Sequence, residues 1–287
     1  METYHFRKES CGSVLSIAIT SSSDPAAIVR GCFSICDAFE QRYSRFIPGN
    51  WLDTINKQQE QGITLDDEAS KLIKLMLEVA ELTQGLFDPT VIATLEAYGY
   101  DKDYSFQKKQ GGPMGYKHVQ LHDNILVLHD GVRLEFGTVG KGYLLDVMKD
   151  KLIQSGIQDF VLDFGGDIYA QGGHKIGLEN PFDLQQVIGT IQVDGFAVAS
   201  SNGKKRAVGD FHHLLDAVTG KPVMDIAGVY IAAPSGLLAD TYSTAVFVSG
   251  AQRGMELLQH TKDISGMIVF ADGSYRKTYD YPGQLFE

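Results

Sequence analysis

The sequence contains no apolar run long enough to cross a membrane. A spanning helix needs about 20 predominantly apolar residues, and every apolar stretch here is shorter. The opening residues, METYHFRKES, also lack the apolar segment of a secretory signal peptide. We therefore expect a soluble protein with no integral membrane segment, and the cytoplasm is favoured. A chain from which an export signal had been removed would read the same way, so an extracytoplasmic lipoprotein is the alternative.

Basic residues are scarce relative to acidic ones. Lys and Arg together number 25 against 36 for Asp and Glu, which gives a net charge of -11. Such a balance provides no general attraction for nucleic acid or for anionic lipid, so no nucleic-acid partner is expected. A phosphate-bearing small molecule is not excluded, because backbone dipoles and a bound cation can outweigh the global field locally.

Cysteine is also scarce, and its three positions are Cys11, Cys32 and Cys36. Their odd number and wide placement argue against a disulfide scaffold. Cys32 and Cys36 lie one helical turn apart, but no matching Cys or His pair follows at zinc spacing. We therefore expect buried core thiols rather than half of a metal site.

The periodicity of apolar residues predicts an α+β fold. Helical spacing extends from Pro25 to Tyr43, from Asp66 to Gly85, from a glycine-rich turn to Gly156, and over 237–249. Period-two segments predict strands over 12–20, 160–173, 187–193, 196–201 and 227–235, and a β-meander of HVQLH, ILVLH and VRLEF between residues 116 and 136. Without a regular βαβ rhythm, a linker or a repeat, we expect one two-lobed domain over residues 1–287, with mixed, largely antiparallel sheets and flanking helices.

A glycine-rich turn, FGTVGKGY (136–143), precedes the third predicted helix. Gly137, Gly140 and Gly142 at such a junction can leave N–H groups free at the positive end of a helix dipole, and Lys141 adds a cation. A phosphate is a reasonable ligand for this arrangement. A purely structural turn explains the glycines equally well, since the segment is not a Walker loop.

Two histidines precede an aspartate in HHLLDAVTG (212–220). Adjacent residues of an extended segment point to opposite sides, so at most one histidine can serve a given site. A histidine just ahead of a turn aspartate can act as an acid or base or as a nucleophile. The alternative is a pair of surface histidines before a Thr-Gly turn.

The helix predicted over 237–249 carries two polar residues on one face. Asp240 and Thr244 are four residues apart, on a helix otherwise rich in Leu, Ala, Val and Phe. Buried there, a carboxylate and a hydroxyl need partners, and both are hard oxygen ligands of the kind that Mg²⁺ or Ca²⁺ accepts. The alternative is that Thr244 bonds back to its own helix and that Asp240 caps the helix start.

Six segments in order connect these features. They are SRFIPGNWLDTIN, GLFDPTV, LEFGTVGKGYLLD, LDFGGDIYAQG, HLLDAVTGKPV and ADTYSTAVFVSG. With this order and spacing, the chain from Gly12 to Gly250 resembles the FAD:protein FMN transferase (ApbE) family. Each segment is modest alone, but six in the right order are specific.

The resemblance implies a flavin transferase. Members of the family use Mg²⁺ to move the FMN half of FAD onto a Ser or Thr of a partner flavoprotein, as a phosphoester, and release AMP. Some members instead hydrolyse FAD to FMN and AMP, so an FAD pyrophosphatase is one alternative. A non-catalytic flavin-binding protein that keeps the fold is another.

The resemblance also implies roles for individual residues. The metal would be held by Asp240, Thr244 and the backbone carbonyl of Thr138. FAD would be bound by Phe46, Leu86, Phe87, Asp88, Glu135, Lys141 and Leu214, of which Leu214 would contact it chiefly through its backbone. His213 would be the reactive imidazole of a His-x-x-Asp motif, and Asp216 would steady the turn.

Several positions in or beside these segments depart from the usual family pattern. Cys11 stands where methionine is usual, Glu135 replaces an aspartate, and Thr138 replaces a frequent Gly or Ala. Ala217 replaces the proline that usually follows the turn aspartate. These departures bear on affinity and substrate choice more than on the fold.

Overall fold

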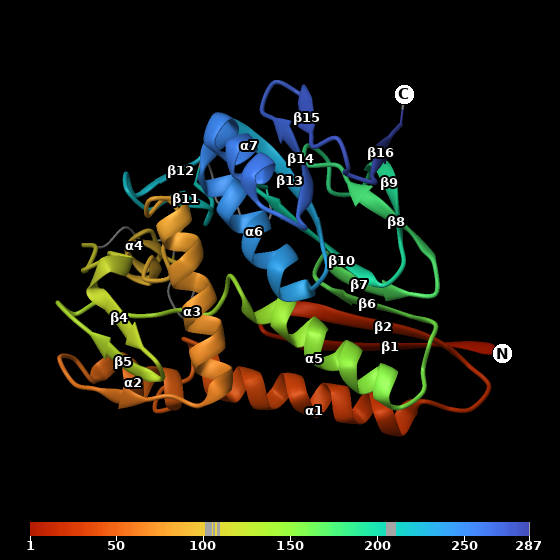
Figure 1. Cartoon of the computed structure of the whole chain (residues 1–287), viewed down its shortest axis with the longest axis horizontal. Helices are drawn as coiled ribbons and strands as arrows, with labels where there is room; N and C mark the ends of the chain where they lie inside the picture. The colour runs from red at the N-terminus through yellow and green to blue at the C-terminus, as the bar shows by residue number, and fades with distance from the viewer. Residues whose placement is uncertain (101–104, 106, 108–109, 205–210, 287) are drawn as a thin grey trace.

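Eight strands form the largest sheet of the structure, a computed structural model (Figure 1). It describes residues 1–100, 105, 107, 110–204 and 211–286. The strand order is β1-β2-β6-β7-β10-β13-β14-β15, and every neighbouring pair is antiparallel. The bounds of this main sheet are β1 (Glu2–Ser10), β2 (Ser13–Ser21), β6 (Phe160–Phe164), β7 (Asp167–Gln171), β10 (Phe196–Asn202), β13 (Ile226–Ala233), β14 (Ser265–Phe270) and β15 (Tyr275–Lys277).

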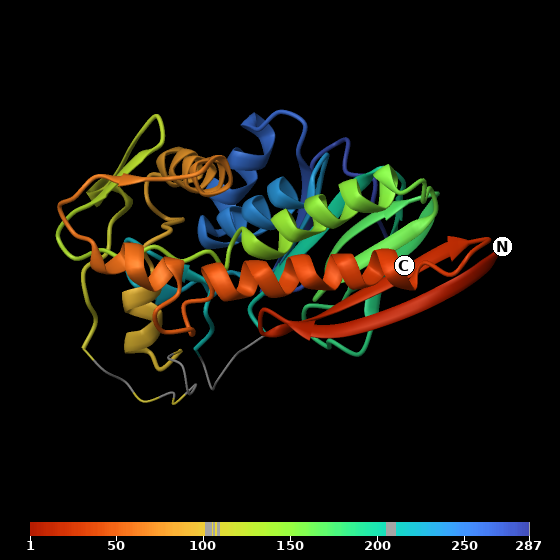
Figure 2. The ribbon, with the colours of Figure 1, turned by 90° about the horizontal axis from the view of Figure 1, so that it is seen from below.

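Helices cover one face of the main sheet (Figures 1 and 2). Leu15, Ile17 and Ile19 alternate along β2 and are almost fully buried in the same core cluster as the helices' apolar residues. Period-two burial of this kind is what sets the register of a half-covered strand. The covering helices are α1 (Ala26–Tyr43), α5 (Gly140–Gln154), α6 (Gly236–Val248) and α7 (Gly250–His260).

A small sheet covers the other face of the main sheet. Leu178 and Ile191 from this sheet share a second apolar cluster with Val198, Tyr230 and Met267 from the main sheet. The strand order is β16-β9-β8. The bounds are β8 (His174–Glu179), β9 (Val187–Val193) and β16 (Gln284–Leu285).

The remaining elements form the second lobe, on the left of Figure 1. Its main helix, α3, begins after Asp66, whose side chain accepts a hydrogen bond from the Ala69 N–H at 3.0 Å, as an N-cap should. The bounds are α2 (Trp51–Lys57), β3 (Ile63–Thr64), α3 (Asp67–Leu82), α4 (Ile92–Ala97), a 3₁₀ turn (Tyr116–His118), β4 (Val119–His122), β5 (Ile125–Leu128), β11 (Leu215–Asp216) and β12 (Lys221–Pro222).

The third strand of the predicted β-meander is wrong. β4 and β5 pair as expected, but β3 takes the place beside β5 that was predicted for VRLEF (132–136). The backbone of that segment bonds to loops instead: the Leu134 N–H donates to Asn56 Oδ1 at 2.8 Å, and the Glu135 N–H donates to the Pro89 carbonyl at 3.0 Å. The segment is thereby led into the glycine-rich turn.

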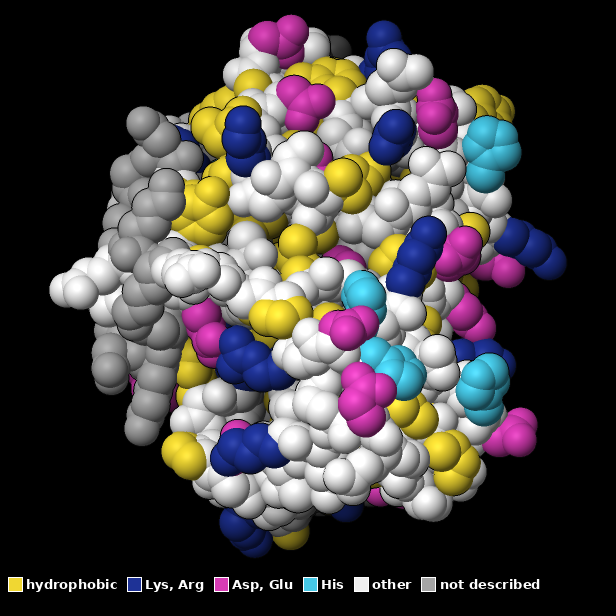
Figure 3. All heavy atoms as spheres, turned by 90° about the vertical axis from the view of Figure 1, so that its left-hand side faces the viewer, with side chains coloured by type: hydrophobic (Ala, Val, Ile, Leu, Met, Phe, Trp, Pro, Cys, Tyr) yellow, Lys and Arg dark blue, Asp and Glu magenta, His cyan; other side chains and the backbone are white. Residues whose placement is uncertain are grey.

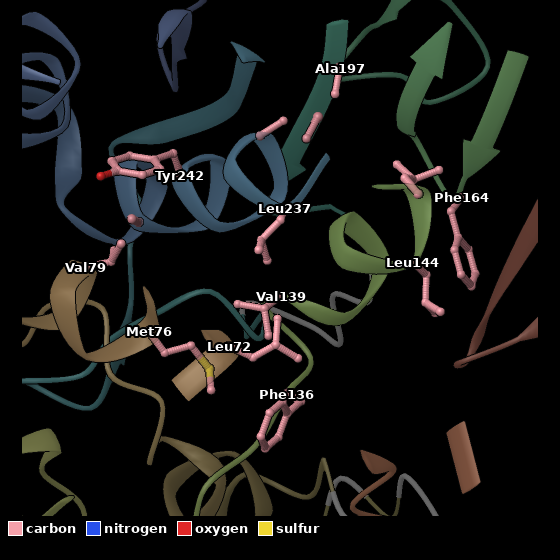
Figure 4. Close-up of a cluster of buried hydrophobic side chains, with 14 of the residues drawn as sticks. Leu72, Met76, Val79, Phe136, Val139, Leu144, Phe164, Ala197, Leu237 and Tyr242 are labelled. Atoms are coloured by element: carbon pink, nitrogen blue, oxygen red, sulfur yellow. The ribbon is translucent and has the colours of Figure 1, made fainter. Parts of the chain in front are cut away.

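The hydrophobic core joins the two lobes beside that turn. In Figure 4, Leu72 and Met76 of α3 lie close to Phe136 and Val139, and Leu237 of α6 approaches from the opposite side. All five belong to one buried cluster. The α+β fold with largely antiparallel sheets is therefore confirmed. That residues 1–287 form one domain remains our prediction.

Two surface properties complete the description. Over the described residues, no helix has the length and apolar character required to cross a membrane. Acidic and basic side chains are interspersed on the face shown in Figure 3. The acidic excess of the sequence is therefore not gathered into one patch on that face.

Candidate active site

A cavity of about 860 Å³ lies where the two lobes meet the main sheet. This volume is in the upper part of the range for small-molecule and cofactor sites, roughly 300–1,000 Å³. Eleven of the twelve site residues expected from the sequence line it, and Asp216 is the exception. The eleven are Phe46, Leu86, Phe87, Asp88, Glu135, Thr138, Lys141, His213, Leu214, Asp240 and Thr244.

The crossing of α5 and α6 places the polar residues of the two helices side by side. A Cβ atom on Gly142 would lie 2.2 Å from the Gly236 carbonyl oxygen, so only glycine permits this approach. The Asp146 carboxylate accepts hydrogen bonds from the N–H groups of Gly236 (2.7 Å) and Leu237 (3.0 Å), which anchors the start of α6 on α5. As a result Asp240, one turn further along α6, faces Lys141 and Gly142.

Gly142→Ala is therefore expected to destabilise the fold by about 3 kcal/mol, the upper end of ordinary overpacking costs. The added methyl group would meet backbone, which cannot move without shifting α6. Gly31→Ala in α1 is the matched control, since its Cβ would meet only the flexible end of Lys151. Thermal unfolding should show a lower Tm for the first variant and an unchanged or higher Tm for the second. Equal Tm values would contradict the close crossing.

The glycine-rich turn does not offer free N–H groups at its three glycines. The N–H groups of Gly137, Gly140 and Gly142 donate, respectively, to the Glu135 carboxylate (3.0 Å), the Phe136 carbonyl (2.9 Å) and the Asp240 carboxylate (3.0 Å). The glycines serve close packing: a Cβ on Gly137 would lie 2.7 Å from Glu135 Oε2, and one on Gly140 would lie 2.9 Å from the Phe39 ring. Of the two alternatives for these glycines, the hydrogen bonds support a structural turn, because the turn uses all three N–H groups internally.

Lys141 lies between two buried carboxylates. Its ammonium group contacts Asp167 and lies 3.3 Å from Asp240 Oδ1, and both acids are less than a tenth exposed. Burial alone would lower the pKa of Lys141, but the two carboxylates outweigh it and raise that pKa. Burial raises the pKa of Asp240, the negative charge of Asp167 raises it further, and Lys141 opposes both.

This cluster contains more acidic than basic groups, and Lys141 and Asp240 of it line the cavity. One lysine faces two carboxylates, so one negative charge is left over when all three groups are ionised. A pyrophosphate would be repelled from such a wall unless a cation came with it. The electrostatics thus favour a site for a metal ion together with an anionic ligand.

The residues expected to hold a metal fit a hard divalent ion. Over the described residues, no three His, Cys, Asp or Glu side chains are grouped to hold a metal, so hydroxyl or carbonyl oxygens must contribute. Thr138 was expected to contribute its backbone carbonyl, but its side chain also offers an oxygen: Oγ1 is buried and has no hydrogen-bond partner in the described chain. The hydroxyls of Thr241 and Ser243 bond back to their helix, and no such bond is found for Thr244 in the described structure. With Asp240, these oxygens suit Mg²⁺.

The alternative in which Asp240 caps α6 and Thr244 bonds back to its own helix is not what the structure shows. Ser235, not Asp240, caps the helix, because its hydroxyl accepts from the Leu238 N–H at 3.2 Å. The Asp240 carboxylate instead reaches across to α5, where Gly142 and Lys141 donate to it. Asp240 and Thr244 therefore line the cavity rather than serve their own helix.

The 86–91 loop forms another wall, which Asp88 holds together. One oxygen of its buried carboxylate accepts from the Thr90 N–H (2.8 Å) and hydroxyl (2.6 Å), and the other accepts from the Tyr116 N–H (2.8 Å). Burial raises the pKa of Asp88, while these hydrogen bonds act in the opposite direction. Leu86 ties this wall to the histidine loop, since its carbonyl accepts from the Ala217 N–H at 3.2 Å.

Phe46, which also lines the cavity, is covered by a cation. The Arg45 guanidinium lies 4.3 Å from the centre of the Phe46 ring and donates to the Tyr100 carbonyl at 2.7 Å. Arg45, Phe46 and Tyr100 all line the cavity. An aromatic face supported by a fixed cation is suited to stacking against a planar ring system.

The two adjacent histidines separate as the sequence predicts. His213 lines the cavity, and its ring lies 6.3 Å from that of Tyr100, whereas His212 turns into the core. Asp216 lies outside the lining, and its Oδ1 accepts from the N–H groups of Val218 (2.8 Å) and Thr219 (3.1 Å). This geometry makes Asp216 a support of the turn that follows His213.

Comparison with known proteins gives the family and the fold. A model described as the ApbE family matches residues 11–268. The chain belongs to the ApbE family. The crystal structure of the ApbE protein from Thermotoga maritima has a TM-score of 0.87 and 26% sequence identity, and 97% of each chain is covered. The apo flavinyl transferase ApbE of Pseudomonas stutzeri shares the fold, with a TM-score of 0.83 at 19% identity over 97% of this chain and 96% of that one.

Curated ApbE relatives include two FAD:protein FMN transferases of which the chain spans about half the length. The Klebsiella pneumoniae protein is 28% identical over 152 residues, which are 51% of this chain and 48% of that protein. The Rhodobacter capsulatus protein is 25% identical over 254 residues, covering 79% and 48%. A third such transferase, from Haemophilus influenzae, is 22% identical over 307 residues, covering 95% and 85%.

Sequence reasoning missed three residues that contact the expected site residues or their loop. Asp167 contacts Lys141, Arg45 covers Phe46, and His212 bonds to the segment that carries His213. A signal existed for Asp167: a carboxylate directly after the Gly165-Gly166 turn, within a segment that reads as a buried strand. For Arg45 the only signal was its position beside Phe46 in a loop, which does not reveal what the guanidinium contacts.

Proposed function

We propose that this protein transfers the FMN moiety of FAD to a Ser or Thr of a partner flavoprotein in a Mg²⁺-dependent reaction that releases AMP. The observation that carries the proposal is the juxtaposition, in one cavity, of the Lys141–Asp240 cluster with the His213 imidazole. The first provides for a metal and a pyrophosphate, and the second provides a base or nucleophile. Family membership and the names of the relatives support the same reaction.

In this reaction the acceptor hydroxyl oxygen forms a bond to the phosphorus of the FMN half. The bond from that phosphorus to the bridging oxygen breaks, and AMP leaves with the electron pair. The hydroxyl proton must be taken up, and His213, which lines the cavity, would accept it. In the other route, the His213 nitrogen attacks the phosphorus first and AMP leaves with the electron pair. The acceptor hydroxyl oxygen then attacks the same phosphorus, the phosphorus–nitrogen bond breaks, and the FMN moiety passes to the acceptor while the imidazole takes up the hydroxyl proton.

The residues of the cavity divide the remaining tasks. Asp240, Thr244 and Thr138 would hold a divalent ion, which when bound would neutralise charge on the pyrophosphate oxygens. Lys141 would add a fixed positive charge along the pyrophosphate, and Phe46 would provide a face for a ring. The Leu214 N–H and carbonyl are already bonded, to His212 and Val223 respectively. Leu214 would therefore contact FAD through the part of the residue that lines the cavity.

Incubation with FAD, Mg²⁺ and a flavoprotein fragment carrying a Ser or Thr acceptor tests the proposal. The expected result is a fluorescent acceptor band on a denaturing gel, which is absent when the acceptor residue is Ala. Free FMN and AMP without a labelled acceptor would show FAD pyrophosphatase activity instead. Bound but unchanged FAD would show a flavin-binding protein without turnover and would contradict the proposal.

A further inference from the structure

We infer that His212 is a positioning residue, a neutral imidazole that clamps the backbone beside His213 and so sets where the reactive ring points. His212 is a buried side chain on a segment that is neither helix nor strand. It does not line the cavity, so it cannot touch substrate directly. Its contacts nevertheless converge on the loop that carries His213.

Three hydrogen bonds close a ring around His212. The Leu214 N–H donates to His212 Nδ1 (3.3 Å), and His212 Nε2 donates to the Val223 carbonyl (3.0 Å). The Val223 N–H in turn donates to the Leu214 carbonyl (3.2 Å). Leu214 directly follows His213. Its N–H is held by the His212 imidazole, and its carbonyl is held by Val223, the residue just after β12.

The partners of His212 define its tautomer. A backbone N–H can only donate, so Nδ1 must be unprotonated where it meets Leu214, and a carbonyl can only accept, so Nε2 must carry the hydrogen facing Val223. Burial lowers the pKa of His212, which favours this neutral form, while its bond to Val223 acts in the opposite direction. A second proton on Nδ1 would confront the Leu214 N–H.

The imidazole also connects this loop to α6. Its ring meets Phe247 edge-on, with centroids 5.8 Å apart and planes at 87°, and Phe247 lies three residues beyond Thr244. On another side, a Cβ on Gly203 would come within 3.3 Å of the His212 ring, so the backbone there is in close contact. Through these contacts, His212 links the backbone beside His213 to α6, the helix that carries Asp240.

This inference rests on the proposed function in giving His213 a reaction to perform, whereas the clamp itself is a property of the free protein. Three variants separate its parts. His212→Phe keeps a ring but loses both hydrogen bonds. His212→Asn keeps an acceptor near Nδ1, and His212→Gln keeps a donor near Nε2.

Two measurements are needed for each variant. Hydrogen exchange of the Leu214 amide, measured in the flavin-free protein, reports on the clamp regardless of activity. Steady-state transfer with FAD and the acceptor fragment gives kcat and KM separately. His174→Phe is the matched control, because His174 also forms two hydrogen bonds through its ring, to Asp159 (2.9 Å) and the Gln171 carbonyl (3.1 Å), on the small sheet.

The expected result for His212→Phe is faster Leu214 exchange and a kcat lower by roughly 10- to 100-fold, the scale of a misplaced reacting group, with a smaller change in KM. The Asn and Gln variants should fall between it and the wild type, and His174→Phe should match the wild type. Unchanged Leu214 exchange in all three variants, or faster exchange with an unchanged kcat, would overturn the inference. Should the Phe variant fail to fold, wild-type kcat in both Asn and Gln variants would overturn it equally.

An inactive wild-type protein would sink the proposed function and leave the clamp to be judged by exchange alone. Faster exchange in His212→Phe would then support the clamp, and unchanged exchange would refute it. The two failures are therefore distinguishable.

Discussion

Asp240→Ala is expected to lower Mg²⁺-dependent turnover of FAD by about 10³-fold or more, since several kcal/mol of charge stabilisation would be lost at about 1.4 kcal/mol per tenfold. The side chain contributes the carboxylate that faces the cavity from α6, and no other acid there is in reach of both Lys141 and the Gly142 N–H among the described residues. Turnover measured over a range of Mg²⁺ concentrations checks the prediction. The variant should show little response to the metal.

The control for this variant is Asp225→Asn. The Asp225 carboxylate accepts a hydrogen bond from the Ala251 N–H (2.9 Å) at the start of α7, and it lies outside the cavity lining. The control should lower the Tm while its Mg²⁺ response remains that of the wild type. Full activity of Asp240→Ala with Mg²⁺ would contradict the metal site.

His213→Ala is expected to lower kcat by about 10³-fold, within the range for loss of a positioned acid–base group. FAD should still bind with a nearly unchanged Kd, because the other walls of the cavity are intact. Single-turnover rates and flavin-fluorescence titration measure the two quantities separately. His118→Ala is the control, since His118 pairs with Asp130 (2.7 Å) and is not among the residues that line the cavity. A His213→Ala enzyme with wild-type kcat would remove the imidazole from the mechanism.

A reaction of the wild-type enzyme without acceptor distinguishes the two routes to transfer. If His213 attacks first, a brief reaction without acceptor should leave flavin on the enzyme's own band, stable to alkali and lost in acid, as a phosphorus–nitrogen bond would be. If His213 acts only as a base, no flavin appears on the enzyme band, whether the sample is treated with alkali or with acid.

Predictability from the sequence differed between elements for physical reasons. α3 is predicted from an Asp N-cap and a regular apolar face, and both are local properties of the sequence. β1 was not predicted, because it is an edge strand whose side chains are mostly exposed or half-exposed and so show little apolar alternation. VRLEF alternates like a strand, yet its backbone is bonded by Asn56 and Pro89, which are distant in sequence.

The site shows the same division between local and distant information. Asp240 and Thr244 could be placed on one helical face from their spacing alone. That they bind a metal was implied by the family resemblance. What the glycine turn does with its N–H groups depends on Glu135 and Asp240, and the latter lies about a hundred residues away in the chain. The clamp at His212 depends on Val223 in the same way, because a hydrogen bond across a loop leaves no periodic trace in the sequence.

Transfer of FMN from FAD to a protein hydroxyl is tested most directly by quantifying AMP and FMN-bearing acceptor together in one reaction with FAD and Mg²⁺, using intact-protein mass spectrometry for the acceptor. If the proposed transfer takes place, the two products appear in equal amounts and only when the acceptor carries its Ser or Thr. FAD recovered unchanged, or AMP released with an equal amount of free FMN and an unmodified acceptor, would contradict it.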